Sequence, residues 1–158
     1  MREKVDSFLD FMTVERGISP NTITAYRNDL LQLVEYLEAR DPRYRNGNGW
    51  ESVDDRTISA YVLHLHDKSY SDTTRARKMA STRSLFNFLL QEGIVEDDPT
   101  ANLSTPRVGR SLPEALTIED VERLLTAVAV PATAPEAKRD QAMLELLYAS
   151  GMRVSELV

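Results

Sequence analysis

The sequence contains no cysteine, no long apolar run and no excess of positive charge, and each absence excludes a class of protein. A chain without cysteine is not a disulfide-stabilised scaffold, and it fits a reducing compartment. No apolar run approaches the roughly 20 residues that a membrane span requires. The first residues, MREKVDSFLDFM, also lack the continuous apolar core of a signal peptide. We therefore expect a cytoplasmic protein that does not use a membrane.

The length suits one ordinary domain, or a small domain and part of another, because the chain has 158 residues. Hydrophobic residues make up 42% of it, which is ample for a packed core. Charged residues make up 28% and are interspersed with regular apolar positions, so the chain is not a disordered tail.

The charge balance argues against a nucleic-acid partner, but its distribution argues for one. Lys and Arg number 19 against 25 Asp and Glu, a net charge of −6 with a pI near 5.0. Nucleic-acid-binding domains commonly have a pI above about 9. Residues 68–83 nevertheless contain five cations and one anion, a local net charge of +4. Such a patch can attract a polyanion while the rest of the surface stays acidic.

Apolar residues at helical spacing predict four helices in the first hundred residues. The first carries Val5, Phe8, Leu9 and Met12 and ends near Gly17. The second runs from about 20 to 39, with Ser19 as N-cap and Pro20 in the first turn. After a polar loop over 41–52, Asp54 caps the third helix, and the fourth begins at Ser71 and ends before Gly93.

The basic patch lies on the fourth predicted helix, and 100° steps divide its side chains between two faces. Ala76, Met79, Arg83, Phe86 and Leu90 fall on the apolar face, so we expect Arg83 to be packed or paired inside the protein. The face expected to point outward carries Thr74, Arg77, Lys78, Ser81 and Ser84.

Pro and Gly residues without periodicity predict a linker after a short turn at Asp98-Pro99. Beyond it, Thr117 caps one helix, and a second runs from about 136 to 150 and ends at Gly151. No segment alternates like a strand. We therefore predict an all-α fold: a four- to five-helix domain over 1–104, a linker over 105–115 and a second, incomplete domain over 116–158.

Three segments occur in the order and spacing of a known family: GISPNTITAYRNDL, SLFNFLLQEGIVEDDPTANLSTPRVGRSLPEAL and RDQAMLELLYASGMRVSELV. With them the chain resembles, over essentially its whole length, the Xer-type tyrosine recombinases of the phage-integrase superfamily. The resemblance implies a SAM-like core-binding domain that clamps double-stranded DNA, followed by the start of a catalytic domain. It also implies site-specific recombination through a 3′-phosphotyrosyl intermediate, without a cofactor, by tetramers on two duplexes.

The resemblance assigns Arg153, in ASGMRVSEL, as the first catalytic arginine. A guanidinium suits this role because its planar fork binds two phosphate oxygens and stays protonated. The alternative is an ordinary ion pair with Glu156, three residues further along a helix. None of the six tyrosines matches the family's nucleophile motif, and we expect Tyr148 to be a core residue. We therefore expect this chain to bind DNA without cutting it.

Two predicted helices carry the candidate DNA contacts. They are Thr74, Arg77, Lys78 and Ser81 on the fourth helix and Thr24, Arg27 and Asn28 on the second. For the fourth helix the alternative is a solvated charged face. For the second helix it is surface polarity or capping together with Asn21. His64 and His66 lack a matching Asp, Glu or Cys cluster, so we expect no metal site.

Two functions of other classes stay open. One is a non-catalytic helical interaction module, because the apolar face of 116–158 needs a partner; this reading predicts a dimer or exchange of that segment between chains. The other is a DNA-binding regulator without strand exchange.

Overall fold

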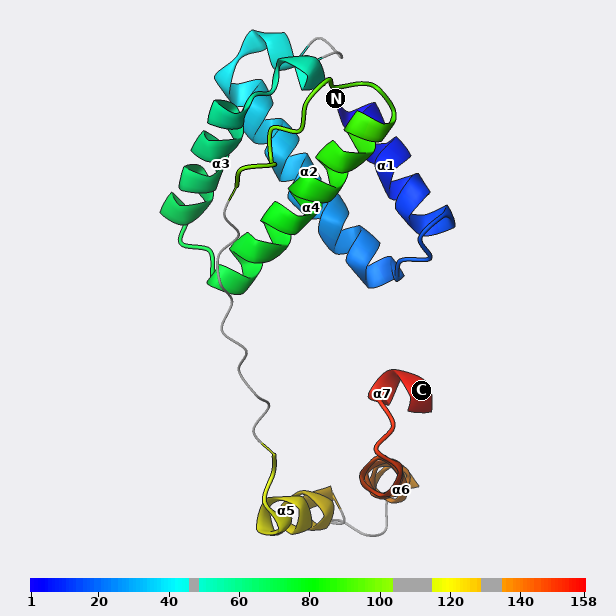
Figure 1. Ribbon diagram of the computed structural model, residues 1–158. Coiled ribbons are helices and arrows are strands. Elements are labelled where there is room, and N and C mark those ends of the chain that lie inside the picture. The colour runs from blue at the N-terminus through cyan, green and yellow to red at the C-terminus, as the bar shows by residue number, and fades with distance from the viewer. Residues whose placement is uncertain (46–48, 104–114, 129–134) are drawn as a thin grey trace. The chain divides into compact units, whose positions relative to one another are not determined.

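The computed structural model describes residues 1–45, 49–103, 115–128 and 135–158 (Figure 1). The chain divides into two compact units, Met1–Gly109 and Arg110–Val158. Regular structure in the described residues consists of α-helices and two short 3-10 helices, with no strand. The prediction of an all-α fold is confirmed. The predicted linker falls almost entirely outside the described residues, so its bounds stay a prediction.

Two antiparallel helices, α1 (Arg2–Val14) and α2 (Pro20–Arg40), begin the first unit. The predicted cap of α2 is present: the Ser19 hydroxyl accepts a hydrogen bond from the Thr22 N–H at 3.3 Å. Apolar side chains on the facing stripes are fully buried because the two helices pack along their length; these are Val5, Phe8, Leu9, Leu30, Leu33, Val34 and Leu37.

The segment expected to be a polar loop is instead two 3-10 helices, η1 (Pro42–Arg45) and η2 (Gly49–Ser52), with residues 46–48 outside the described part. Tyr44 and Trp50 in these turns are buried. The Trp50 indole donates a hydrogen bond to the Met1 carbonyl at 3.2 Å. A Cβ on Gly49 would lie 2.8 Å from the Tyr44 Cα, so only glycine allows the turns to approach this closely. The loop prediction was wrong because these partners are distant in the sequence.

Helices α3 (Asp55–Asp67) and α4 (Asp72–Gln91) complete the first unit. Asp54 caps α3 as predicted, since its carboxylate accepts hydrogen bonds from the Thr57 N–H and hydroxyl at 2.8 and 2.6 Å. These bonds hold the pKa of Asp54 below its ordinary value. Ser71 likewise caps α4 by accepting from the Thr74 N–H at 3.3 Å.

Helix α4 is central to the first unit, because α1, α2 and α3 all contact it. Figure 1 shows the segment that follows α4 running back beside the helix, on the side of α3. The buried part of the α4 surface is therefore wider than the apolar face predicted from the sequence. The buried set includes Lys78, Ser81 and Thr82, whereas Leu90, predicted to be apolar core, is 39% exposed. Arg83 is partly buried and donates to the Leu103 carbonyl at 2.9 Å, as expected for a packed arginine.

A buried ion pair joins α2 to α4. The Lys78 ammonium donates to the Asp29 carboxylate at 2.9 Å, and the two side chains are 3% and 2% exposed. Lys78 also donates to the Gln32 side chain at 2.7 Å and lies over the Tyr70 ring, 5.1 Å from its centroid. Burying two charges is tolerated here because each has several polar or aromatic partners.

The second unit contains α5 (Ile118–Val128), α6 (Pro135–Ser150) and α7 (Val154–Leu157). Thr117 caps α5 as predicted, accepting from the Asp120 N–H at 3.1 Å. None of its described residues is buried. Tyr148, expected to be core, is 63% exposed, because no described residue of the second unit covers that face of α6.

No helix within the described residues is long and apolar enough to cross a membrane.

Removing one member of the buried ion pair should be far more damaging than removing both. We expect Asp29→Ala to lower the free energy of unfolding by about 3–5 kcal/mol, because Lys78 is left buried without its carboxylate. The double variant Asp29→Leu with Lys78→Met should change it by no more than about 1 kcal/mol. Urea denaturation of both variants tests this, and equal losses would contradict it.

The capping bond at Asp54 should contribute stability that depends on pH. Asp54→Ala should cost about 1 kcal/mol at neutral pH, and Asp54→Asn clearly less, because asparagine keeps an acceptor at the cap. Since the folded-state pKa is lowered from 3.8, the contribution of the charge is present above that value and is lost as the pH falls through the folded pKa. Denaturation across this pH range should therefore show the gap between wild type and Asp54→Asn closing in acid.

Candidate functional site

Helices α2 and α4 both begin at the lower side of the first unit in Figure 1, apart from each other, and they cross further along, where Lys78 meets Asp29. Their caps are built alike. In each, a serine hydroxyl accepts from the backbone N–H three residues later, and the two hydroxyls lie 3.0 Å apart, in the pairs Ser19–Thr22 and Ser71–Thr74. The first turns therefore present small hydroxyl side chains beside the positive ends of two helix dipoles, a combination that favours anions.

Arg77 of α4 contacts two groups of α2. Its Nη1 donates to the Asp29 carboxylate and to the Ala25 carbonyl, the latter at 3.3 Å. The side chain is 41% exposed, so it remains open to solvent while one end of its guanidinium is held. This placement agrees with the expected outward face.

Lys78 and Ser81 do not lie on the exposed face, and that part of the prediction was wrong. Lys78 is 3% exposed and Ser81 is fully buried. The Ser81 hydroxyl donates to the Lys78 carbonyl at 2.9 Å, so its hydrogen bond stays within the helix. Both face the neighbouring elements because α4 is surrounded on several sides. We leave them out of the candidate interface.

The three candidates on α2 are accessible to different degrees. Thr24 is exposed, but its hydroxyl donates back to the Pro20 carbonyl at 2.9 Å. Arg27 pairs with Asp6 of α1, and its side chain is 44% exposed. Asn28 is exposed. Thr74, on α4, is partly buried and bonded to its cap. Arg77 thus lies where the two helices cross, and the other exposed or partly buried candidates lie in the amino-terminal halves of α2 and α4.

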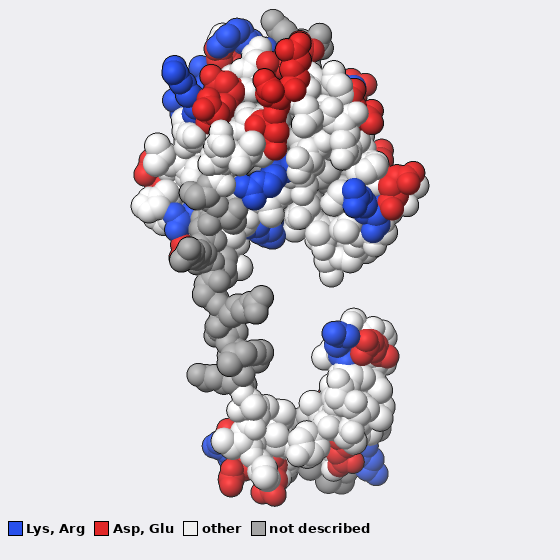
Figure 2. Space-filling model, viewed as in Figure 1, with Lys and Arg blue, Asp and Glu red and all other residues white. Residues whose placement is uncertain are grey.

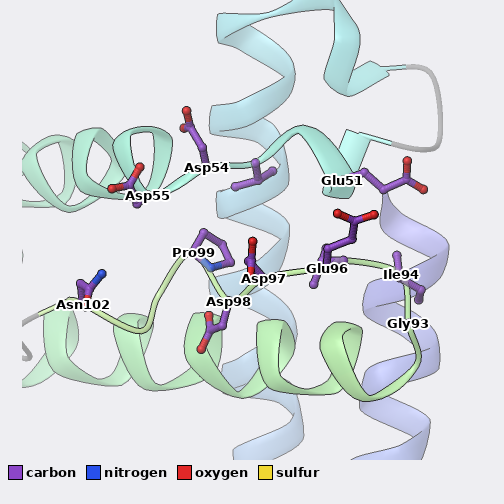
Figure 3. Close-up of a pocket in the computed structure, with 12 residues that line it drawn as sticks. Glu51, Asp54, Asp55, Gly93, Ile94, Glu96, Asp97, Asp98, Pro99 and Asn102 are labelled. Atoms are coloured by element: carbon purple, nitrogen blue, oxygen red, sulfur yellow. The ribbon is translucent and has the colours of Figure 1, made fainter.

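An acidic pocket of about 820 Å³ lies between the start of α3 and the segment after α4. Figure 3 shows its carboxylates coming from both walls. They belong to Glu51, Asp54, Asp55, Glu96, Asp97 and Asp98. Figure 2 shows acidic side chains gathered over the same part of the first unit. Like charges disfavour a polyanion on this side of the first unit.

Arg153 lies in the second unit, at the N-cap position of α7. Gly151 has a φ of +66°, which lets the chain leave α6 and turn into α7. The guanidinium pairs with Glu156 at 3.2 Å, and the side chain is 82% exposed. The ion pair weighed as the alternative reading is therefore present, and it leaves the guanidinium accessible.

Tyr61 illustrates that not every tyrosine is available for chemistry. It is 1% exposed, and burial raises its pKa well above the ordinary range. A phenol in this setting is a packing group of the core.

The described residues contain no group of His, Cys, Asp and Glu arranged to hold a metal ion. His64 packs against the Tyr36 ring, 4.8 Å between centroids.

Asp29 is the important residue that sequence reasoning missed. It follows Tyr26 by three residues and precedes Leu33 by four, so it lies on the apolar stripe of α2. An acid on a buried stripe requires a cation from a neighbouring helix. That signal was available in the sequence and would also have indicated a buried cation on another helix.

The chain matches the family described as phage integrase, N-terminal SAM-like domain, over residues 5–93. It is 42% identical over 158 residues to the tyrosine recombinase XerC of Herpetosiphon aurantiacus, covering all of this chain and 50% of that protein. It is 44% identical to XerC of Roseiflexus castenholzii, covering 48% of it, and 41% identical to the tyrosine recombinase XerD of Halalkalibacterium halodurans, covering 51%.

The chain thus spans about half the length of these curated relatives. The similarity includes both units, since it extends over all of the residues. The chain belongs to the phage integrase N-terminal SAM-like domain family, and its homologues are Xer tyrosine recombinases.

Proposed function

We propose that this chain is the DNA-binding portion of a site-specific tyrosine recombinase that cleaves and rejoins strands through a 3′-phosphotyrosyl intermediate. The observation that carries the proposal is the crossing of α2 and α4, where Asp29 and Ala25 of α2 hold the Arg77 guanidinium while the side chain stays 41% exposed. Relatives named as tyrosine recombinases match the whole chain. The proposal includes a cytoplasmic location, with double-stranded DNA as the substrate.

The amino-terminal halves of α2 and α4 would contact DNA mainly through phosphates. Arg77 is a phosphate ligand, with Thr24, Arg27, Asn28 and Thr74 around it as the other contacts. Arg27 and Arg77 each have an acidic partner in the protein, so few positive charges are uncompensated. Binding to non-specific DNA should be weak and sensitive to salt, because counterion release scales with the number of phosphates neutralised.

Arg153 would serve the whole recombinase as a catalytic arginine. Its exposure at the start of α7, beside an accompanying Glu156, leaves the guanidinium able to bind a phosphate. The nucleophilic tyrosine is proposed to lie outside this chain, which would make the chain inactive by itself. In this proposal, residues 1–104 form the core-binding domain and 116–158 begin the catalytic domain. Other recombinase protomers complete a tetramer on two duplexes.

Substituting Arg77 should weaken DNA binding without unfolding the protein. We expect Arg77→Ala to reduce affinity for a mixed-sequence duplex several-fold. The salt slope, the dependence of log affinity on log salt concentration, should fall by about one, as for the loss of one phosphate contact. Fluorescence anisotropy across a salt series measures both. Arg43→Ala is the matched control, because Arg43 is an exposed arginine that also pairs with an aspartate but lies in η1. Equal effects of the two substitutions would contradict the proposed interface.

A second candidate function, a helical interaction module, is favoured by the second unit. Its helices expose Leu124, Leu146 and Tyr148 by 45%, 46% and 63%. Neighbouring exposed apolar side chains favour association with another protein or another copy of the chain.

Light scattering tests this second function. If the second unit drives association, the chain should dimerise with concentration, and Leu146→Asp should shift it to monomer. Leu63→Asp is the control, because Leu63 is 67% exposed but lies on α3 of the first unit. A monomer at all concentrations would exclude self-association.

A further inference from the structure

Asp29 binds two cations of α4, one on each carboxylate oxygen. Oδ1 accepts from the buried Lys78 ammonium at 2.9 Å, and Oδ2 accepts from the guanidinium of Arg77. The two cations are adjacent in the sequence but differ in exposure: the Lys78 side chain is 3% exposed and the Arg77 side chain 41%. One cation of the triad is therefore enclosed by the protein, and the other reaches the surface.

Lys78 is enclosed by partners within the protein. An ammonium group has three N–H donors. Asp29 and Gln32 accept from this one, and the Tyr70 ring lies against it. Tyr70 in turn donates to the Gln32 side chain at 3.4 Å, which links the partners to one another. Lys78 can influence an anion outside the protein only through its charge and through its partners.

The charges of the triad explain why a buried lysine is useful here. Asp29 and Arg77 alone would have a net charge of zero, so the carboxylate that orients the guanidinium would also cancel its attraction for a phosphate. With Lys78 the sum is +1, and the exposed member is Arg77. Like charges so close together are sustained because the carboxylate lies between them.

Arg77 is also held in place. Its Nη1 is shared between the Asp29 carboxylate and the Ala25 carbonyl, both on α2. A guanidinium held at one nitrogen loses less side-chain freedom when its other donors bind a ligand, and this lowers the entropy cost of binding.

We propose that Asp29 and Lys78 are positioning residues, an enclosed ion pair that fixes the Arg77 guanidinium at the surface without cancelling its charge, so that Arg77 can bind a DNA phosphate. The proposal rests on the proposed function and deepens it. Neither Asp29 nor Lys78 touches the DNA. Their effect on binding is exerted through Arg77.

Three variants separate charge from packing. Lys78→Met removes the buried positive charge and leaves Asp29 to neutralise Arg77. Asp29→Asn with Lys78→Met removes both buried charges and restores the triad sum to +1. Arg77→Ala removes the phosphate ligand. Should Lys78→Met fail to fold by circular dichroism, Lys78→Gln replaces it, because glutamine keeps a donor for Asp29 without the charge.

The readout is the salt slope for binding a labelled mixed-sequence duplex. A purely structural role of Lys78 would leave the slope of the folded variants unchanged. We expect Lys78→Met to lower the slope by close to one and the affinity several-fold, as Arg77→Ala does. The double variant should recover most of both. A wild-type slope in folded Lys78→Met, or a double variant no better than Lys78→Met, would overturn the proposal.

A second measurement separates failure of this inference from failure of the proposed function. The Arg77 side-chain N–H resonance is followed by NMR during titration with inorganic phosphate. Wild type and the double variant should respond more strongly than Lys78→Met. If wild type bound no duplex at low salt but kept this order, the DNA-binding function would fail and the charge arrangement would stand. Equal responses in all three proteins would overturn the arrangement.

Discussion

At the crossing of α2 and α4, the buried charges of Asp29 and Lys78 each require the other. Each charge is almost fully enclosed, so neither residue can lose its partner without leaving an uncompensated charge in the interior. The pair lies where the two helices cross (Figure 1). The aromatic and aliphatic core around it stabilises the unit, but the pair also sets which side chains of α4 lie beside α2.

In the first unit, the acidic pocket and the accessible Arg77 lie in different places. Carboxylates line the pocket between α3 and the segment after α4, away from the start of α2 and α4 (Figure 3). The acidic composition of the chain and the proposed binding of a polyanion are compatible because the charges are separated in space.

Much of the helical framework could be predicted because its signals are local. Ser19, Asp54 and Thr117 were identified as caps from the sequence, and each accepts its bond from a residue three positions along. The buried turns at Tyr44 and Trp50 could not be predicted in this way, because the partner of Trp50 is Met1. The exposure of Tyr148 was also misjudged, since periodicity marks an apolar face without showing what covers it.

The sequence by itself determined the helix boundaries, the resemblance to tyrosine recombinases and the concentration of cations on the fourth helix. The tertiary structure alone decided which of those cations reaches the surface. Arg77 and Lys78 are neighbours in the sequence, yet one is accessible and the other enclosed. The reason is that helical periodicity gives only the direction of a side chain around its own axis. Whether that direction leads to solvent depends on how many other elements surround the helix, and several surround α4.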